Sequence, residues 1–367
     1  MSTTYRYALP VEQTGWRIDA AMEASFAWEY EDGRARLLNL YDTAKKQQWD
    51  AALRIDWDQP LDPGNPMRLD DRGLAIAESP VWARMGEDDR ARVRRHVQAH
   101  TISQFLHGEQ GALMVAARLV QCAPQMDAKF YAATQTMDEA RHVEAYSRLL
   151  HEKFDLVYPI TPGLRSLLDD ILSDSRWDMC YLGMQVLIEG LALAAFQRYR
   201  DSAQNPLARQ VNAYVMQDEA RHVAFGRIAL RDLYPELTDA ERAEREEFVI
   251  EACRHMRDRF DQREVWENLG LGGEIADLVS RSETMKAFRR RLFSRIVPVV
   301  RDIGLWSPRV RQAFVDMQAL EYADLDVDAV LADDARVAEE FDAKRHVERA
   351  IAAAPRPSPP TDEQVDR

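Results

Sequence analysis

The sequence DEARHV occurs at residues 138–143 and again, letter for letter, at 218–223, which is an interval of 80 positions. Glu109 and Glu189 are separated by the same interval, and each is a lone carboxylate in an apolar segment, FLHGEQGALMVAARLV or YLGMQVLIEGLALAAF. A buried carboxylate is costly unless it meets a cation, a proton or a strong partner. The repeat therefore predicts a duplicated pair of helices with an unusual polar centre.

The spacing also predicts where each helix pair turns. The midpoint of residues 109 and 139 is Pro124, and the midpoint of residues 189 and 219 lies beside Asn205-Pro206. Each glutamate is about 15 residues from its turn, or roughly 22 Å at 1.5 Å rise per residue. The two glutamates of each hairpin should therefore lie at the same depth of a helix bundle.

Within each DEARH motif, the glutamate and the histidine are three residues apart and share one helix face. Two such hairpins, packed face to face, would bring together four carboxylates and two imidazoles, the ligand set of a two-metal site in a four-helix bundle. Oxygen and imidazole ligands in this number suit iron or manganese better than zinc. The predicted metal ligands are Glu109, Glu139, His142, Glu189, Glu219 and His222.

The other polar residues of the motif suit a supporting layer. An aspartate can accept a hydrogen bond from the non-ligating nitrogen of a histidine and so fix its tautomer. The expected pairs are crosswise: Asp218 with His142, and Asp138 with His222. The arginine of each motif, Arg141 or Arg221, would balance the aspartate charges.

The competing interpretation is that Glu-x-x-His forms surface ion pairs on ordinary helices. Two copies with matching upstream glutamates and Pro-marked turns argue against it. His107 is two residues from Glu109 and should face elsewhere. The remaining histidines are expected to face solvent or cap helices (His96, His100, His151, His255, His346). Four apolar residues near the motifs are expected in the core (Met114, Met137, Met184, Leu193).

Helical periodicity dominates the rest of the chain, so we expect an all-α protein with one domain over residues 1–353. Its metal-binding four-helix core should span about 86–233, with additional helices before and after it. Residues 33–53 are predicted to form one helix before this core. The segment 354–367 is Pro-rich and polar, which predicts a disordered tail.

Composition limits the partners of the protein. The net charge of −14 argues against nucleic acid and anionic membrane surfaces. The three cysteines show no motif spacing, the first residues lack a signal-peptide pattern, and no apolar run was expected to reach membrane-spanning length. These features favour a cytoplasmic protein without a membrane partner.

At the duplicated motif the chain resembles the ferritin-like dimetal-carboxylate superfamily. The doubled D-E-x-R-H is most similar to the bacterial multicomponent monooxygenase hydroxylases, with arylamine N-oxygenases and the ribonucleotide reductase small subunit as further relatives. The N-terminal segment LYDTAKKQQWDAALRIDW also resembles segments that precede the bundle in such relatives. The resemblance implies two iron ions, with manganese as an alternative, and O₂ as co-substrate. It implies one metal held by Glu109, Glu139 and His142, the other by Glu189, Glu219 and His222, and bridging by Glu139 and Glu219.

Several positions depart from individual relatives. Methane-type hydroxylases carry a threonine where this chain has Leu193, and arylamine N-oxygenases carry a third histidine where Val215 stands. The ligand-binding oxidases cross-link a valine and a tyrosine at positions that Gly111 and Met184 occupy here. These departures leave the reaction type open.

Tyr146 follows His142 by four residues, the place of the radical tyrosine in the ribonucleotide reductase small subunit. Two roles are open for it. It is either a core aromatic residue that faces the same side as His142 or a residue with a redox role. A redox role would make it the one catalytic side chain predicted outside the metal ligands.

The sequence therefore predicts a non-haem di-iron oxidase or oxygenase that acts on an apolar or aromatic small molecule or an acyl chain. The alternatives are a radical-bearing or ligand-binding oxidase and a non-catalytic metal- or ligand-binding protein. The chain carries no Rossmann fingerprint and no cysteine cluster motif, so electrons should come from a separate ferredoxin or reductase. A homodimer is compatible with this reading.

Overall fold

The computed structural model describes residues 18, 24–26, 33–258 and 260–353. Within these ranges the regular structure is helical apart from the isolated bridge residue Val157. The predicted all-α, ferritin-like class is confirmed. The predicted tail at 354–367 lies outside the described residues.

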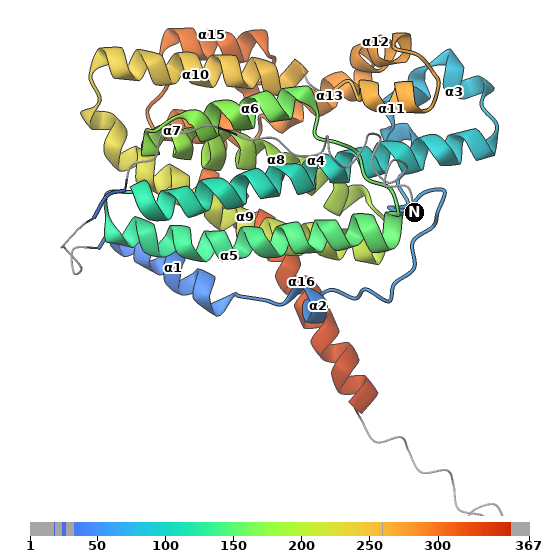
Figure 1. Ribbon diagram of the computed structural model, residues 1–367, viewed down its shortest axis with the longest axis horizontal. Helices are drawn as coiled ribbons and strands as arrows, with labels where there is room; N and C mark the ends of the chain where they lie inside the picture. The colour runs from blue at the N-terminus through green and yellow to red at the C-terminus, as the bar shows by residue number, and fades with distance from the viewer. Residues whose placement is uncertain (1–17, 19–23, 27–32, 259, 354–367) are drawn as a thin grey trace, which may run out of the picture.

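Two long helical hairpins form the centre of the molecule (Figure 1). The first consists of α4 (Glu87–Cys122) and α5 (Met126–Arg148). The second consists of a continuous helical run, with α7 (Trp177–Tyr181), a π-helical segment (Leu182–Ile188) and α8 (Glu189–Ser202), followed by α9 (Pro206–Leu233). Within each hairpin the two partners pack along each other, and α5 also contacts α9.

Both hairpins turn where the spacing of the repeat predicts. Pro124 lies between α4 and α5, and residues 203–205 join α8 to α9. Pro206 occupies the first turn of α9, where its missing N–H costs no hydrogen bond, and the Asn205 side chain accepts a hydrogen bond from the backbone N–H of Ala208 at 3.2 Å. The turn chemistry thus sets the depth of each glutamate.

The helical run Trp177–Ser202 is long and apolar enough to cross a membrane, so the expectation that no apolar run reaches that length is wrong. In this fold 94% of its most apolar 18-residue window is buried inside the protein. A core helix of a bundle meets the same criteria of length and composition because other helices surround it.

Further helices surround the two hairpins. They are α1 (Ala35–Lys46), α2 (Ala51–Arg54), α3 (Pro80–Arg84), α6 (Pro162–Ser173), α10 (Asp239–Asp258), α11 (Arg263–Asn268), α12 (Glu274–Arg281), α13 (Glu283–Leu292), α14 (Ile296–Asp302), α15 (Pro308–Asp316) and α16 (Val327–Ala353). Helix α1 lies along α5, and α16 packs against α9 (Figure 1). The predicted single helix over residues 33–53 is wrong, because the chain leaves the helix after Lys46 and Asp50 caps α2.

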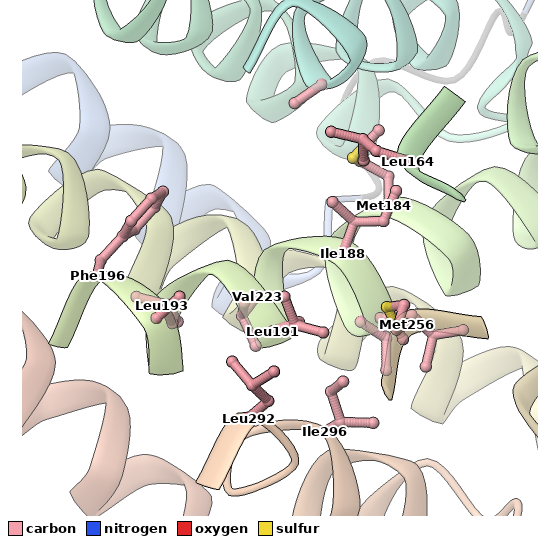
Figure 2. Close-up of a cluster of buried hydrophobic side chains, with 14 of the residues drawn as sticks. Leu164, Met184, Ile188, Leu191, Leu193, Phe196, Val223, Met256, Leu292 and Ile296 are labelled. Carbon is pink, nitrogen blue, oxygen red and sulfur yellow. The ribbon is translucent and has the colours of Figure 1, made fainter. Parts of the chain in front are cut away.

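The later helices close the bundle over α8. Figure 2 shows Leu191 of α8 near Leu292 and Ile296, which belong to the end of α13 and the start of α14. A Cβ atom at Gly190 would lie 3.2 Å from Ile296 Cγ1, so the small residue beside Glu189 permits this close approach. Burial of each such leucine or isoleucine stabilises the fold by roughly 1.5–3 kcal/mol.

Two predicted core residues are on the surface instead. Met114 is 40% exposed and Met137 is 59% exposed, so the prediction for them is wrong. Both lie on the outward faces of α4 and α5, which helical spacing near the motif does not distinguish from the inward faces. Met184 and Leu193 are fully buried, as expected.

Asp334 anchors α16 to the bundle through a buried ion pair. Its carboxylate accepts hydrogen bonds from Arg295 Nη2 at 2.6 Å and Nε at 3.0 Å, and both side chains are buried. We predict that Asp334→Ala lowers the free energy of unfolding by about 3–5 kcal/mol, because it leaves the buried guanidinium unpaired. Urea denaturation measures the change in the free energy of unfolding. The control Asp333→Ala, at a half-exposed neighbour, should change stability by less than about 1 kcal/mol; equal losses in the two variants would contradict the prediction.

Candidate metal centre

The structure brings all six predicted ligand side chains together at the centre of the bundle. Helix α4 carries Glu109, α5 carries Glu139 and His142, α8 carries Glu189, and α9 carries Glu219 and His222. All six are buried. Possible ligand atoms of Glu109, Glu139, His142 and Glu219 lie within 4.8 Å of one another, and so do those of Glu139, Glu189 and His222.

Glu139 belongs to both of these groups, which suits a bridging position. Glu219 shares a group with Glu109, although the resemblance assigned it to the metal of Glu189. Its Oε1 lies 3.1 Å from His142 Nδ1 and 3.4 Å from His222 Nδ1. Glu219 therefore lies between the two histidines, and the two groups form one continuous cluster.

Both histidines direct Nδ1 toward the carboxylates and Nε2 toward an aspartate. His142 Nε2 lies 3.2 Å from Asp218 Oδ2, and His222 Nε2 lies 3.3 Å from Asp138 Oδ2. These are the crosswise pairs that the sequence predicts. An ionised aspartate only accepts hydrogen bonds, so it fixes the proton on Nε2 and leaves Nδ1 for the centre.

The charges of the centre perturb one another strongly. Burial, together with the nearby carboxylate of Glu219, raises the pKa values of Glu109 and Glu189 well above the ordinary range. Burial acts in the same direction on Glu139, but the two neighbouring imidazoles outweigh it and hold the pKa of Glu139 well below its usual value. Protons on some groups therefore take the place of a cation in balancing the buried negative charge.

The unpaired atoms of the centre fit bound metal ions. Glu189 Oε2, both carboxylate oxygens of Glu219 and His222 Nδ1 are buried and have no hydrogen-bond partner among the described residues. The short distances from Glu219 to the histidines are those of charge pairs without hydrogen-bond geometry. Buried polar atoms without partners are costly. Four carboxylates with two imidazoles supply the oxygen and nitrogen donors that iron or manganese prefers.

Arginines surround the two aspartates, as the sequence predicts. Arg141 pairs with Asp138 and also donates to Asp218 Oδ2 at 3.1 Å. Arg221 pairs with Asp218 and lies 3.6 Å from Asp138 Oδ2. The four side chains form a closed, buried network in which each positive charge faces two negative ones. This network compensates the aspartates that orient the histidines.

The segment Gln47–Trp49 completes this network, and sequence reasoning missed its role. Gln48 Nε2 donates to Asp138 Oδ1 at 2.8 Å, Trp49 Nε1 donates to Asp218 Oδ2 at 2.7 Å, and Gln47 Oε1 accepts from Arg221 at 2.6 Å. All three residues follow the end of α1 at Lys46. The resemblance of the N-terminal segment to relatives was the available signal.

A cavity that is partly open to solvent adjoins the centre. Its wall includes the carboxylates of Glu109, Glu189 and Glu219. Five aromatic side chains also line it: Phe105, Phe196, Tyr199, Phe260 and Phe288. The centre is therefore accessible from a predominantly apolar and aromatic space.

His100 also lines this cavity. It is only 4% exposed, and its Nε2 lies 3.4 Å from Glu264 Oε2, so the expectation of a solvent-facing histidine is wrong. Helix α11, which carries Glu264, covers it, and sequence spacing could not place that helix. His107 faces away from the centre, as predicted, and contacts the backbone oxygen of Tyr158 at 2.9 Å.

Tyr146 lies in the core near the centre. Its hydroxyl donates to Asn212 Oδ1 at 3.1 Å, and its ring packs against Phe105 and Phe196 with centroid separations of 5.8 and 5.9 Å. Burial, with a contribution from Glu109, raises its pKa well above the ordinary value. The packing suits a core aromatic residue, and the proximity to Glu109 also suits a redox role.

Solved structures with similar helical arrangements include R2-like ligand-binding oxidases. Two variants with an anaerobically reconstituted Mn/Fe cofactor are each 15% identical to this chain, with TM-scores of 0.47 and 0.48. The two matches cover 77% and 76% of this chain, and each covers 96% of the oxidase chain. A photoconverted form is 12% identical, with a TM-score of 0.40, and the match covers 86% of this chain and 98% of that one. No curated protein sequence matches the chain.

A family model described as p-aminobenzoate N-oxygenase AurF matches residues 30–304. This match includes α1, both central hairpins, all six predicted ligands and the helices that line the cavity. The N-oxygenases are among the relatives that the repeated motif suggests. The chain belongs to the p-aminobenzoate N-oxygenase AurF family.

Proposed function

We propose that this protein is an O₂-dependent di-iron oxygenase that oxidises the nitrogen of an aromatic amine. The observation that carries the proposal is the aromatic cavity whose wall includes three carboxylates of the buried centre. Membership of the N-oxygenase family supports nitrogen as the site of oxidation. The carboxylate and imidazole donors suit iron, with manganese as an alternative.

Iron would be held at two positions by the six side chains of the centre. Glu109, Glu139 and His142 would hold one ion, Glu189 and His222 the other, with Glu139 and Glu219 between them. The iron pair supplies, when bound, the redox chemistry that reduces O₂. The protein positions the ligands, because Asp218 and Asp138 fix the histidine tautomers.

The cavity would hold the aromatic ring of the substrate. Phe196 and Tyr199 from α8 and Phe105 from α4 provide apolar contacts in the wall of the cavity. An acidic substituent on the ring would meet Arg198, which lines the cavity and lies 4.7 Å from the centroid of the Phe288 ring. An amine at the opposite end of the ring would then lie toward the metal centre.

One departure distinguishes this chain from the arylamine N-oxygenases that the motif resembles. Val215 stands in place of their third histidine, and its fully buried side chain offers no ligand atom. We propose that the six-ligand set is sufficient here. Insertion of one oxygen atom into an N–H bond reduces the second oxygen atom to water and consumes two electrons and two protons. A separate electron donor would supply the electrons, and solvent would supply the protons.

The test is to supply iron-loaded protein with ¹⁸O₂, a chemical reductant and 4-aminobenzoate or aniline, and to analyse the products by mass spectrometry. The proposal expects hydroxylamine or more oxidised nitrogen products that carry ¹⁸O. Benzoate and toluene, which lack the amine, serve as controls. Label on ring carbon would refute nitrogen selectivity, and bound iron with no O₂ consumption would favour a non-catalytic binding protein.

Loss of the shared ligand should abolish assembly of the two-metal site. We predict that Glu139→Ala binds fewer than two equivalents of Fe(II) per chain, because Glu139 belongs to both ligand groups. Anaerobic loading followed by metal analysis measures the stoichiometry. The control Glu144→Ala changes an exposed residue of the same helix and should retain two equivalents. Full occupancy in Glu139→Ala would refute the ligand assignment.

A second candidate function is a radical-bearing oxidase, which the location of Tyr146 favours. Its buried ring lies beside Phe105, and the charge of Glu109 influences its hydroxyl. If this function holds, exposure of the Fe(II)-loaded protein to O₂ should give a lasting tyrosyl radical in electron paramagnetic resonance spectra. Tyr146→Phe would remove that signal while retaining both metals. If Tyr146 is only a core residue, no such signal forms, and Tyr146→Phe should leave amine oxidation within about threefold of wild type.

A further inference from the structure

The two halves of the bundle differ in the residues that surround their otherwise matched ligands. The interval of 80 that relates the ligands also relates Gln135 to Val215 and Phe105 to Gln185. Both glutamines therefore occupy positions where the other half carries an apolar residue. All four side chains belong to the central hairpins, and Gln135 contacts two of the predicted ligands directly.

Gln135 holds two of the predicted ligands through one amide nitrogen. Its Nε2 donates to Glu189 Oε1 at 2.8 Å and to Glu139 Oε1 at 3.0 Å. The side chain of Gln135 is fully buried, one helical turn before Glu139 on α5. Glu139 belongs to both ligand groups, whereas Glu189 belongs only to the group that includes His222. The hydrogen bond to Glu189 therefore acts on one metal position in particular.

Gln185 fixes the orientation of this amide. Its Nε2 donates to Gln135 Oε1 at 3.4 Å, so the nitrogen of Gln135 must face the carboxylates. Gln185 lies in the π-helical segment that leads directly into Glu189. A Cβ atom at Gly226 would lie only 2.5 Å from Gln185 Cβ, so glycine at this position of α9 lets the glutamine backbone approach the centre.

The corresponding glutamate of the first half has no such support. Among the described residues, the structure gives Glu109 a hydrogen-bond contact only with His142, at 3.2 Å, and His142 is itself a predicted ligand. Val215, at the place that corresponds to Gln135, is buried and apolar. Glu189 is thus held from outside the ligand set, and Glu109 is not.

We propose that Gln135, oriented by Gln185, is a positioning residue that fixes Glu189 and makes the two metal positions unequal. The inference rests on the proposed dimetal function. The hydrogen bond occupies Glu189 Oε1 and leaves Oε2, which has no partner, as the atom for the metal. Glu109 keeps the freedom to change its coordination, which places the adaptable carboxylate at the other metal position.

The test is a stepwise titration of the metal-free protein with Co(II). Calorimetry measures the affinity of each binding step, and the visible absorption of bound Co(II) reports the number of ions bound. Gln135→Leu should weaken one of the two binding steps by about 10–100-fold, the usual effect of losing a hydrogen bond to a metal ligand. The other step should change by less than about threefold. A general folding defect would weaken both steps, so this split separates positioning from a structural role.

Gln185→Leu provides a second variant that leaves Gln135 in place. It should weaken the same binding step to a smaller extent. In the double variant, the fold-loss of affinity should be smaller than the product of the two single fold-losses, because both residues act through one contact. Thr136→Ala, which changes the neighbour of Gln135 on α5, is the matched control and should leave both steps unchanged.

The outcomes separate this inference from the proposed function. Two Co(II) ions bound by wild type, with both steps unchanged or equally weakened in Gln135→Leu, would overturn the inference and leave the dimetal function intact. Fewer than two ions bound by wild type would overturn both. Weakening of one step in both glutamine variants, with Thr136→Ala unaffected, is the result that the inference requires.

Discussion

The burial of four carboxylates in the middle of an apolar helix bundle is the constraint on which the rest of this structure depends. Each of these groups is buried at the contact of the two hairpins, where its charge is poorly solvated. The two imidazoles supply part of the compensation and protons supply another part, as the raised pKa values of Glu109 and Glu189 indicate. A pair of metal ions satisfies the remaining lone pairs and would replace those protons.

This constraint extends outward as alternating layers of charge. The histidines face the carboxylates, Asp138 and Asp218 face the histidines, and the arginines of the motifs face the aspartates. The charged groups of each layer are buried and need hydrogen-bond or ion-pair partners in the layers around them. The segment Gln47–Trp49 supplies the outermost of these partners. The interruption between α1 and α2 places these three side chains against the buried network.

The sequence was sufficient for those features that depend on periodicity. A shared interval and two Pro-marked turns placed the six ligands at one depth, and helical spacing gave the crosswise Asp–His pairs. It was insufficient where contact depends on helices remote in the chain. His100 became buried because α11 covers it, and Gln47–Trp49 reached the motif through a break that helix propensity does not predict. The group that contains Glu219 likewise depended on side-chain rotation, which spacing leaves open.

Duplication explains why the two metal positions resemble each other, and divergence of the neighbouring residues explains why they differ. The ligands and the charged residues of the two motifs are identical in both halves, so a common scaffold holds two cations at equal depth. The neighbouring pairs have diverged: Phe105 and Tyr146 pack together in one half, whereas Gln185 and Gly226 occupy the corresponding places in the other. Divergence of residues beside the ligands thus gives the two halves different surroundings without any change in the ligands themselves.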